Sequence, residues 1–63
     1  MRKVRYLGYV IMISPNGKEW MANVFEADIT KQKPLKTILG VGDHAVEAEA
    51  RSYIESIVKQ KTA

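Results

Sequence analysis

The first half of the chain contains two stretches in which the pattern of apolar and polar residues is that of a β-strand. Residues 3–13 are rich in valine, isoleucine and tyrosine, a composition typical of strands. This run stops at Ser14-Pro15-Asn16-Gly17, where proline presets φ and Asn-Gly tolerates the positive φ of a tight hairpin. We therefore predict a first strand over residues 3–13 and a hairpin directly after it.

A second strand is predicted over residues 18–28, because alternate side chains there divide into two faces. A polar stretch, residues 29–34, then leads to a short third strand over residues 35–41. The glycines at 40 and 42 mark its end. The alternating sets of the second strand are Trp20, Ala22 and Val24 on one face and Met21, Asn23 and Phe25 on the other.

The last third of the chain has the period of an amphipathic helix. Asp43 is its predicted N-cap, because an aspartate side chain accepts a free backbone N–H and favours the helix dipole. Apolar residues recur at three- and four-residue spacing from Val46 to Val58, which defines one apolar stripe. A second row, of alternating charge, predicts the solvated face of the helix. Its members are Glu47, Arg51, Glu55 and Lys59.

Together these elements predict an α+β fold in which a three-stranded antiparallel sheet packs on one C-terminal helix. We expect a single βββα domain over residues 1–63, near the lower size limit for folding on a hydrophobic core alone. Such a core supplies only about 3–5 kcal/mol of net stability. The chain has no cysteine, which excludes disulfides and thiolate metal sites. Self-association is the most available further source of stability.

No targeting or membrane segment is evident in the sequence. The longest apolar run, residues 10–13, is far too short to cross a bilayer. The basic residues after Met1 are followed by neither a long apolar stretch nor a small-residue cleavage site. We therefore expect a cytoplasmic protein with no membrane partner.

The predicted sheet has two apolar faces, although one helix covers only one of them. An antiparallel sheet of this kind usually has a polar outer face. An apolar patch left in water commonly marks an interaction surface. The alternatives are single exposed apolar residues with no role, or a tail that folds over them, and the register of the hairpin decides which face is which. We expect a homodimer or another protein partner to contact Leu7, Tyr9, Ile11, Met21 and Phe25.

The net charge of +3 is unevenly distributed in the predicted topology. The first strand begins where the second ends, so the N-terminal basic residues are expected beside the loop at residues 29–34, which the end of the helix also approaches. The resulting basic pole gives an alternative function, nucleic-acid binding through phosphate contacts. A purely solubilising surface is the competing interpretation. The residues that would contact phosphates are Arg2, Lys3, Arg5, Lys31, Lys33 and Lys36.

Catalytic and metal-binding motifs are missing from the sequence. His44 is the only histidine, so neither a histidine-based triad nor a multi-histidine metal site can form within one chain. Gly40-Val41-Gly42 is a lone G-x-G before a helix and is a weak phosphate-binding signal. We expect no enzyme activity, no cofactor and no small-molecule substrate.

The pattern of glycines, tryptophan and alanines is similar to that of a known group of DNA-binding domains. It consists of Gly8, Gly17-Lys18-x-Trp20-x-Ala22-x-Val24, Leu39-Gly40, and Ala45 with Ala50 and Glu55 in the helix. Over about residues 8–57 it resembles the plant ethylene-response-factor and phage-integrase amino-terminal DNA-binding domains. The resemblance implies a sheet that reads the DNA major groove with arginines and tryptophans, where this chain has Met21, Asn23 and Phe25.

The order of elements also resembles that of small uncharacterised bacterial proteins of strand-strand-strand-helix type. This second resemblance implies a fold and no particular activity.

Overall fold

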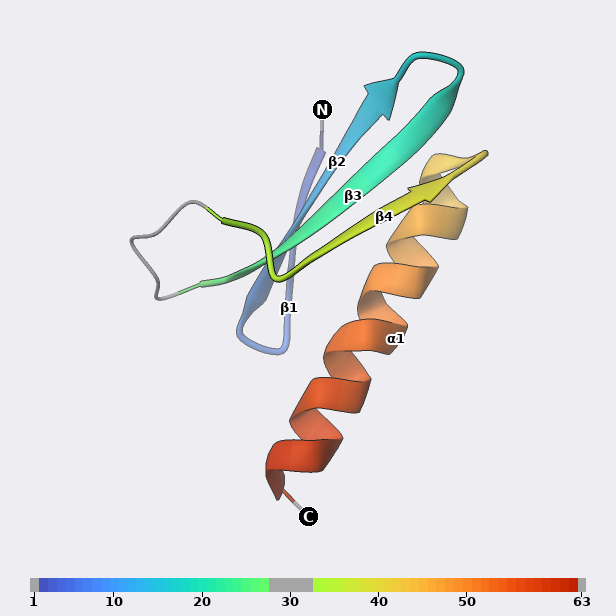
Figure 1. Cartoon of the computed structure of the whole chain (residues 1–63). Helices are drawn as coiled ribbons and strands as arrows, with labels where there is room; N and C mark the ends of the chain where they lie inside the picture. The colour runs from blue at the N-terminus through green and yellow to red at the C-terminus, as the bar shows by residue number, and fades with distance from the viewer. Residues whose placement is uncertain (1, 28–32, 63) are drawn as a thin grey trace.

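A computed structural model describes residues 2–27 and 33–62. It is an α+β fold, as predicted, with an antiparallel sheet and one C-terminal helix, α1 (Asp43–Thr62), on one face of the sheet (Figure 1). The predicted number of strands is wrong, because the sheet has four strands in the order β1-β2-β3-β4. The strands are β1 (Arg2–Tyr6), β2 (Tyr9–Asn16), β3 (Glu19–Glu26) and β4 (Lys36–Gly40).

The additional strand arises because the predicted first strand is divided by a two-residue turn at Leu7-Gly8. Leu7 has φ 51° and Gly8 has φ 83°. Positive φ at both central residues is the pattern of a type I′ turn, whose twist matches that of a β-hairpin. Leucine rarely adopts this conformation, so the apolar run through Leu7 resembles a continuous strand. The turn places Tyr6 directly opposite Tyr9.

The turn decides which residues of β1 face the helix, and the register of β2 with β3 decides the same for β2. Tyr6 and Tyr9 share the helix side of the sheet, and Ile11 and Ile13 follow them along β2. The prediction that Tyr9 and Ile11 lie on the outer face is therefore wrong, since Tyr9 is 6% exposed and Ile11 is 0% exposed. The buried core consists of Tyr9, Ile11, Ile13, Ala22, Val24, Ile38, Val46, Ala50 and Ile54.

The second hairpin is confirmed, but its loop is Gly17 and Lys18, one residue later than the predicted Asn16-Gly17. Gly17 has φ 66°, as expected for the glycine that opens a type II′ turn. However, β2 continues through Pro15 and Asn16 instead of stopping at Ser14. Pro15 has no backbone N–H to donate. It is tolerated because the pairing of β2 with β1 ends at Ile13, so no ladder hydrogen bond to β1 is lost.

The helix begins one residue earlier than its predicted cap implies. The N–H of Val46 donates to the carbonyl of Gly42 over 3.1 Å, so Gly42 holds the N-cap position and Asp43 is the first helical residue. The Asp43 carboxylate still accepts a backbone N–H, that of His44, over 2.9 Å. The predicted apolar stripe is confirmed, with Val46, Ala50 and Ile54 buried against the sheet.

The charged row of the helix contacts β1, so it is not simply the solvated face that its pattern predicts. The Arg2 guanidinium lies 2.7 Å from Glu47, whose side chain is only 14% exposed. Arg51 lies 2.8 Å from the same carboxylate and its guanidinium lies 4.8 Å from the centroid of the Tyr6 ring. The Tyr6 hydroxyl donates to Glu55. Polar contacts therefore attach β1 to α1 beyond the edge of the apolar core.

Gly40 allows the helix to approach β4 closely. A Cβ at this position would lie 2.9 Å from Cγ1 of Val46, which is 1% exposed and has a χ1 that is stiff in a helix. We expect Gly40→Ala to lower the free energy of unfolding by about 1–3 kcal/mol, because overpacked cores relax only with strain. Urea unfolding followed by circular dichroism measures the change.

Gly42→Ser provides the matched control for this substitution. A Cβ at Gly42 meets nothing within 4 Å, and serine is at least as good an N-cap as glycine. The urea midpoint of Gly42→Ser should equal or exceed that of the wild type. Equal midpoints for Gly40→Ala and Gly42→Ser would contradict the close-approach argument.

Candidate binding surface

The face of the sheet opposite α1 is the candidate binding surface, and we call it the open face. Its members follow from strand register, because side chains on one face of paired strands lie opposite one another. Three rows cross the sheet in this way. They are Ser14-Met21-Leu39, Lys3-Met12-Asn23-Thr37 and Arg5-Val10-Phe25.

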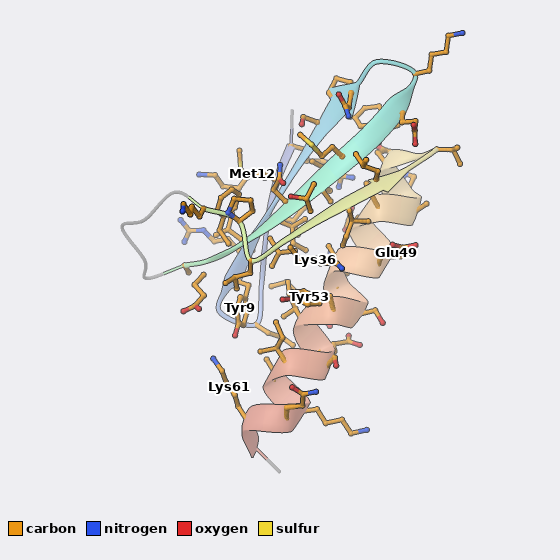
Figure 2. All side chains as sticks on the ribbon, viewed as in Figure 1. Tyr9, Met12, Lys36, Glu49, Tyr53 and Lys61 are labelled. Atoms are coloured by element: carbon orange, nitrogen blue, oxygen red, sulfur yellow. The ribbon has the colours of Figure 1, made fainter. Side chains whose placement is uncertain are left out.

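The middle of the open face is apolar. Val10, Met12, Met21 and Phe25 are all partly exposed and belong to the two central strands. Leu39 adds an exposed side chain, 55% accessible, on β4. Figure 2 shows Met12 on the side of the sheet that points away from α1. Within residues 2–27 and 33–62, no helix or strand lies over this surface.

The structure separates the five predicted interface residues into three locations. Met21 and Phe25 lie on the open face, as expected. Leu7 is 54% exposed in the turn between β1 and β2, whereas Tyr9 and Ile11 are core residues. The residues of β2 that lie on the open face are instead Val10 and Met12. The signal that identifies them is the two-residue hairpin between β2 and β3, whose register places Ile11 opposite Val24 and Val10 opposite Phe25.

A polar pair lies at the centre of this apolar surface. The Thr37 hydroxyl donates to the Asn23 side-chain carbonyl over 2.7 Å. The register places this pair in the same row as Met12 and Lys3. In the part of the chain that the structure describes, the Asn23 amide nitrogen donates no hydrogen bond, so it can donate one to a bound partner.

Arg2 lies away from the place predicted for the basic pole, because the Leu7-Gly8 turn reverses the direction of β1. Arg2 pairs with Ile13, away from the end of β3 where the loop begins. Its guanidinium lies 2.7 Å from Glu47 and 3.7 Å from Asp43, at the acidic start of α1. The prediction that Arg2 lies beside the loop is therefore wrong.

The other predicted phosphate contacts that the structure describes are also dispersed. Lys3 and Arg5 lie on the open face along β1, at one edge of the sheet. Lys36 lies on β4, at the opposite edge, where its register with Val24 places it on the helix side. Lys33 is exposed before β4, and Lys31 lies outside the described residues. Among the described members of this set, only Lys3 and Arg5 share a surface with the apolar residues.

A separate contact joins the end of the helix to the other side of the sheet. The Lys61 ammonium donates to the Tyr9 hydroxyl over 3.2 Å, and Figure 2 shows Lys61 extending from the last turns of α1 toward Tyr9. This hydrogen bond raises the pKa of Lys61, since it favours the charged ammonium. The contact stabilises the helix end and leaves the open face unobstructed.

The described side chains of the kinds that bind metal ions are dispersed. No cluster of three metal-ligating side chains occurs among residues 2–27 and 33–62. His44 is exposed in the first turn of the helix. No helix in the described ranges has the length and apolar character needed to cross a membrane.

Comparisons of the chain with protein-family models, with curated proteins and with solved structures find no match. The function must therefore be argued from the open face itself.

Glu47 provides a test of how β1 is held. The hydrogen bond from Arg51, and then that from Arg2, lower the pKa of the Glu47 carboxyl below its ordinary value. A carboxyl with a lowered folded-state pKa adds stability above its unfolded pKa, about 4.3, and loses it as pH falls through the folded value. We expect Glu47→Gln to lower the midpoint of thermal unfolding at pH 7 and to flatten its decline toward pH 3.

The exposed Glu49 on the same helix supplies the control. Glu49→Gln should retain the wild-type decline in acid. Identical pH profiles for Glu47→Gln and the wild type would contradict the role of these two hydrogen bonds.

Proposed function

We propose that this chain is a protein-binding module whose contact surface is the open face of its sheet. The observation that carries the proposal is the row arrangement of Val10, Met12, Met21 and Phe25 across the two central strands. The outer face of an antiparallel sheet is ordinarily polar, because water covers it. A largely apolar surface in that position is typical of interaction sites.

The chemistry of the surface suits a protein partner. Methionine side chains adapt to irregular partner surfaces, and two of the four central residues are methionines. The Asn23–Thr37 pair supplies a hydrogen-bonding group that orients the partner. Lys3 and Arg5 form a basic rim along β1, so a partner with an apolar centre and acidic groups on one side is complementary. The partner is another protein or a second copy of the chain.

The variants Met21→Glu and Phe25→Glu test this proposal. Each places a charge in the apolar centre, where an unpaired charge would have to be desolvated on binding. We expect loss of the proteins that co-purify with tagged wild-type chain, by about tenfold or more in quantitative mass spectrometry, with the helix and sheet retained by circular dichroism.

Ala48→Glu is the matched control, since Ala48 is exposed on the helix and acquires the same charge. It should retain the wild-type set of partners. If the open-face variants and Ala48→Glu recover the same partners in the same amounts, the open face is not the binding surface.

Nucleic-acid binding is the second candidate, because β1 brings Lys3 and Arg5 onto the open face next to Met12 and Val10. Two phosphate contacts would give weak binding that falls as salt rises. We expect Lys3→Glu with Arg5→Glu to abolish binding to mixed DNA and RNA oligomers at low ionic strength, as measured by fluorescence anisotropy.

Lys18→Glu, in the turn at the other end of β2, is the control with the same change of charge at one site. It should leave such binding nearly unchanged. Absent or salt-insensitive binding of the wild-type chain would exclude this candidate.

A further inference from the structure

The outer edge of β4 carries backbone groups that are not used within the described residues. In the two-residue hairpin between β2 and β3, Asn16 and Glu19 form the hydrogen-bonded pair that closes the loop. Along β3, the backbone N–H and C=O groups of successive residues point alternately to β2 and to β4. Those of Ala22 therefore point toward its partner Ile38 on β4. It follows that the N–H and C=O groups of the neighbouring residues, Thr37 and Leu39, point away from the sheet.

Exposed apolar side chains gather at the same edge. Four large hydrophobic residues are exposed among those described, and three of them lie on β4 or directly beside it. Leu35 is 42% exposed, Leu39 is 55% exposed and Val41 is 87% exposed. An edge strand with free backbone groups and apolar flanks is a template for pairing with another strand.

The opposite edge of the sheet differs in a way that favours pairing at β4. Three of the five residues of β1 are basic. If β1 paired antiparallel with a second β1 about Val4, Lys3 would lie opposite Arg5 of the other copy, and like charges directly opposite destabilise a ladder. β4 contains only one charged residue, Lys36. Repulsion between like charges therefore disfavours self-pairing at β1 and does not disfavour it at β4.

We propose that β4 pairs antiparallel with β4 of a second copy of the chain, with Ile38 opposite Ile38 at the two-fold axis. The two sheets of four strands would then form one continuous sheet. The outward N–H and C=O groups of Thr37 would form hydrogen bonds with those of Leu39 in the second copy. Leu39 of the first copy would form the same bonds with Thr37 of the second. This inference concerns the sheet edge and does not depend on the proposed role of the open face.

This register accounts for the side chains as well as the backbone. Leu39 lies opposite Thr37, and Leu35 lies opposite Val41, so each exposed apolar residue at the edge gains a cross-strand neighbour. Lys36 lies opposite Gly40, so no like charges meet. A shift by two residues that places Thr37 opposite itself would leave Val41 without an apolar partner. The arrangement is isologous, as a closed dimer requires.

The helices leave room for this pairing. α1 packs chiefly on β3, with β2 and β4 on either side. Adjacent strands lie about 4.8 Å apart, which places the two helix axes about 14 Å from each other across the two-fold axis. Packed helices need only about 8–10 Å, so the helices do not collide. The open faces of the two copies would join on the other side of the sheet.

Sedimentation velocity on a pair of Thr37 variants tests the dimer. Thr37→Pro and Thr37→Val both remove the hydroxyl that bonds Asn23, but only proline removes the outward N–H. We expect the dimer dissociation constants of the wild type and Thr37→Val to lie within about threefold of each other. Thr37→Pro should raise this constant at least about tenfold. Met21→Glu, an open-face variant, should remain dimeric, which separates this proposal from the proposed function.

A cross-linking experiment tests the register and keeps the inference falsifiable if Thr37→Pro fails to fold. The chain has no cysteine, so Thr37→Cys mixed with Leu39→Cys reports only the designed contact. Opposed residues in a ladder have Cα atoms about 5.5 Å apart, within the range of a disulfide. We expect rapid heterodimer formation on mild oxidation, and much slower reaction for Lys3→Cys mixed with Arg5→Cys on β1.

The inference is overturned by a wild-type chain that stays monomeric at millimolar concentration, or by Thr37→Pro dimerising as well as Thr37→Val. Equal cross-linking of the β4 and β1 cysteine pairs would also overturn it. If Met21→Glu disrupts the dimer while Thr37→Pro leaves it intact, the chain associates through its open face instead.

Discussion

The turn at Leu7-Gly8 is the constraint on which the remaining architecture depends. Its two residues take positive φ, and they reverse the chain so that β1 returns along β2. Arg2 consequently reaches the acidic start of α1, and the charged row of the helix acquires partners on β1. The same reversal places Tyr6 on the helix side beside Tyr9. The register of β2 with β3 assigns Tyr9 and Ile11 to the core and leaves Val10 and Met12 outside. A conformation that is costly for leucine is thus compensated by a complete extra strand.

The helix covers one face of the sheet by two different kinds of contact. Over β2, β3 and β4 the contact is apolar, with Val46, Ala50 and Ile54 buried, and Gly40 permits the close approach. Over β1 it is polar, through the ion pairs of Glu47 and the stacking of Arg51 on Tyr6. Polar contacts of this kind depend on pH and salt, whereas the apolar part does not. The edge strand β1 is therefore held by the more adjustable part of the interface.

Two surfaces remain for binding, and their properties differ. The open face offers area, an apolar centre and a basic rim, which suits a folded partner or an acidic segment. The outer edge of β4 offers backbone groups and a self-complementary register, which suits a second strand. The two uses are compatible, because pairing at the edge would enlarge the open face without covering it. A domain of 63 residues with a small core also gains stability from association.

The sequence by itself determined the α+β class, a hairpin within one residue of its observed place, the helix and its buried stripe, because each depends on local periodicity and turn chemistry. It also indicated that the sheet has apolar residues on both faces. Only the tertiary structure decided which residues these are. Leu7 gives no local sign of positive φ, so the turn that creates β1 is not evident in the apolar run. The register of β2 with β3 decides which side chains of β2 face the helix. The positions of Arg2 and Lys36 followed from the same reversal and from sheet order, which no local pattern encodes.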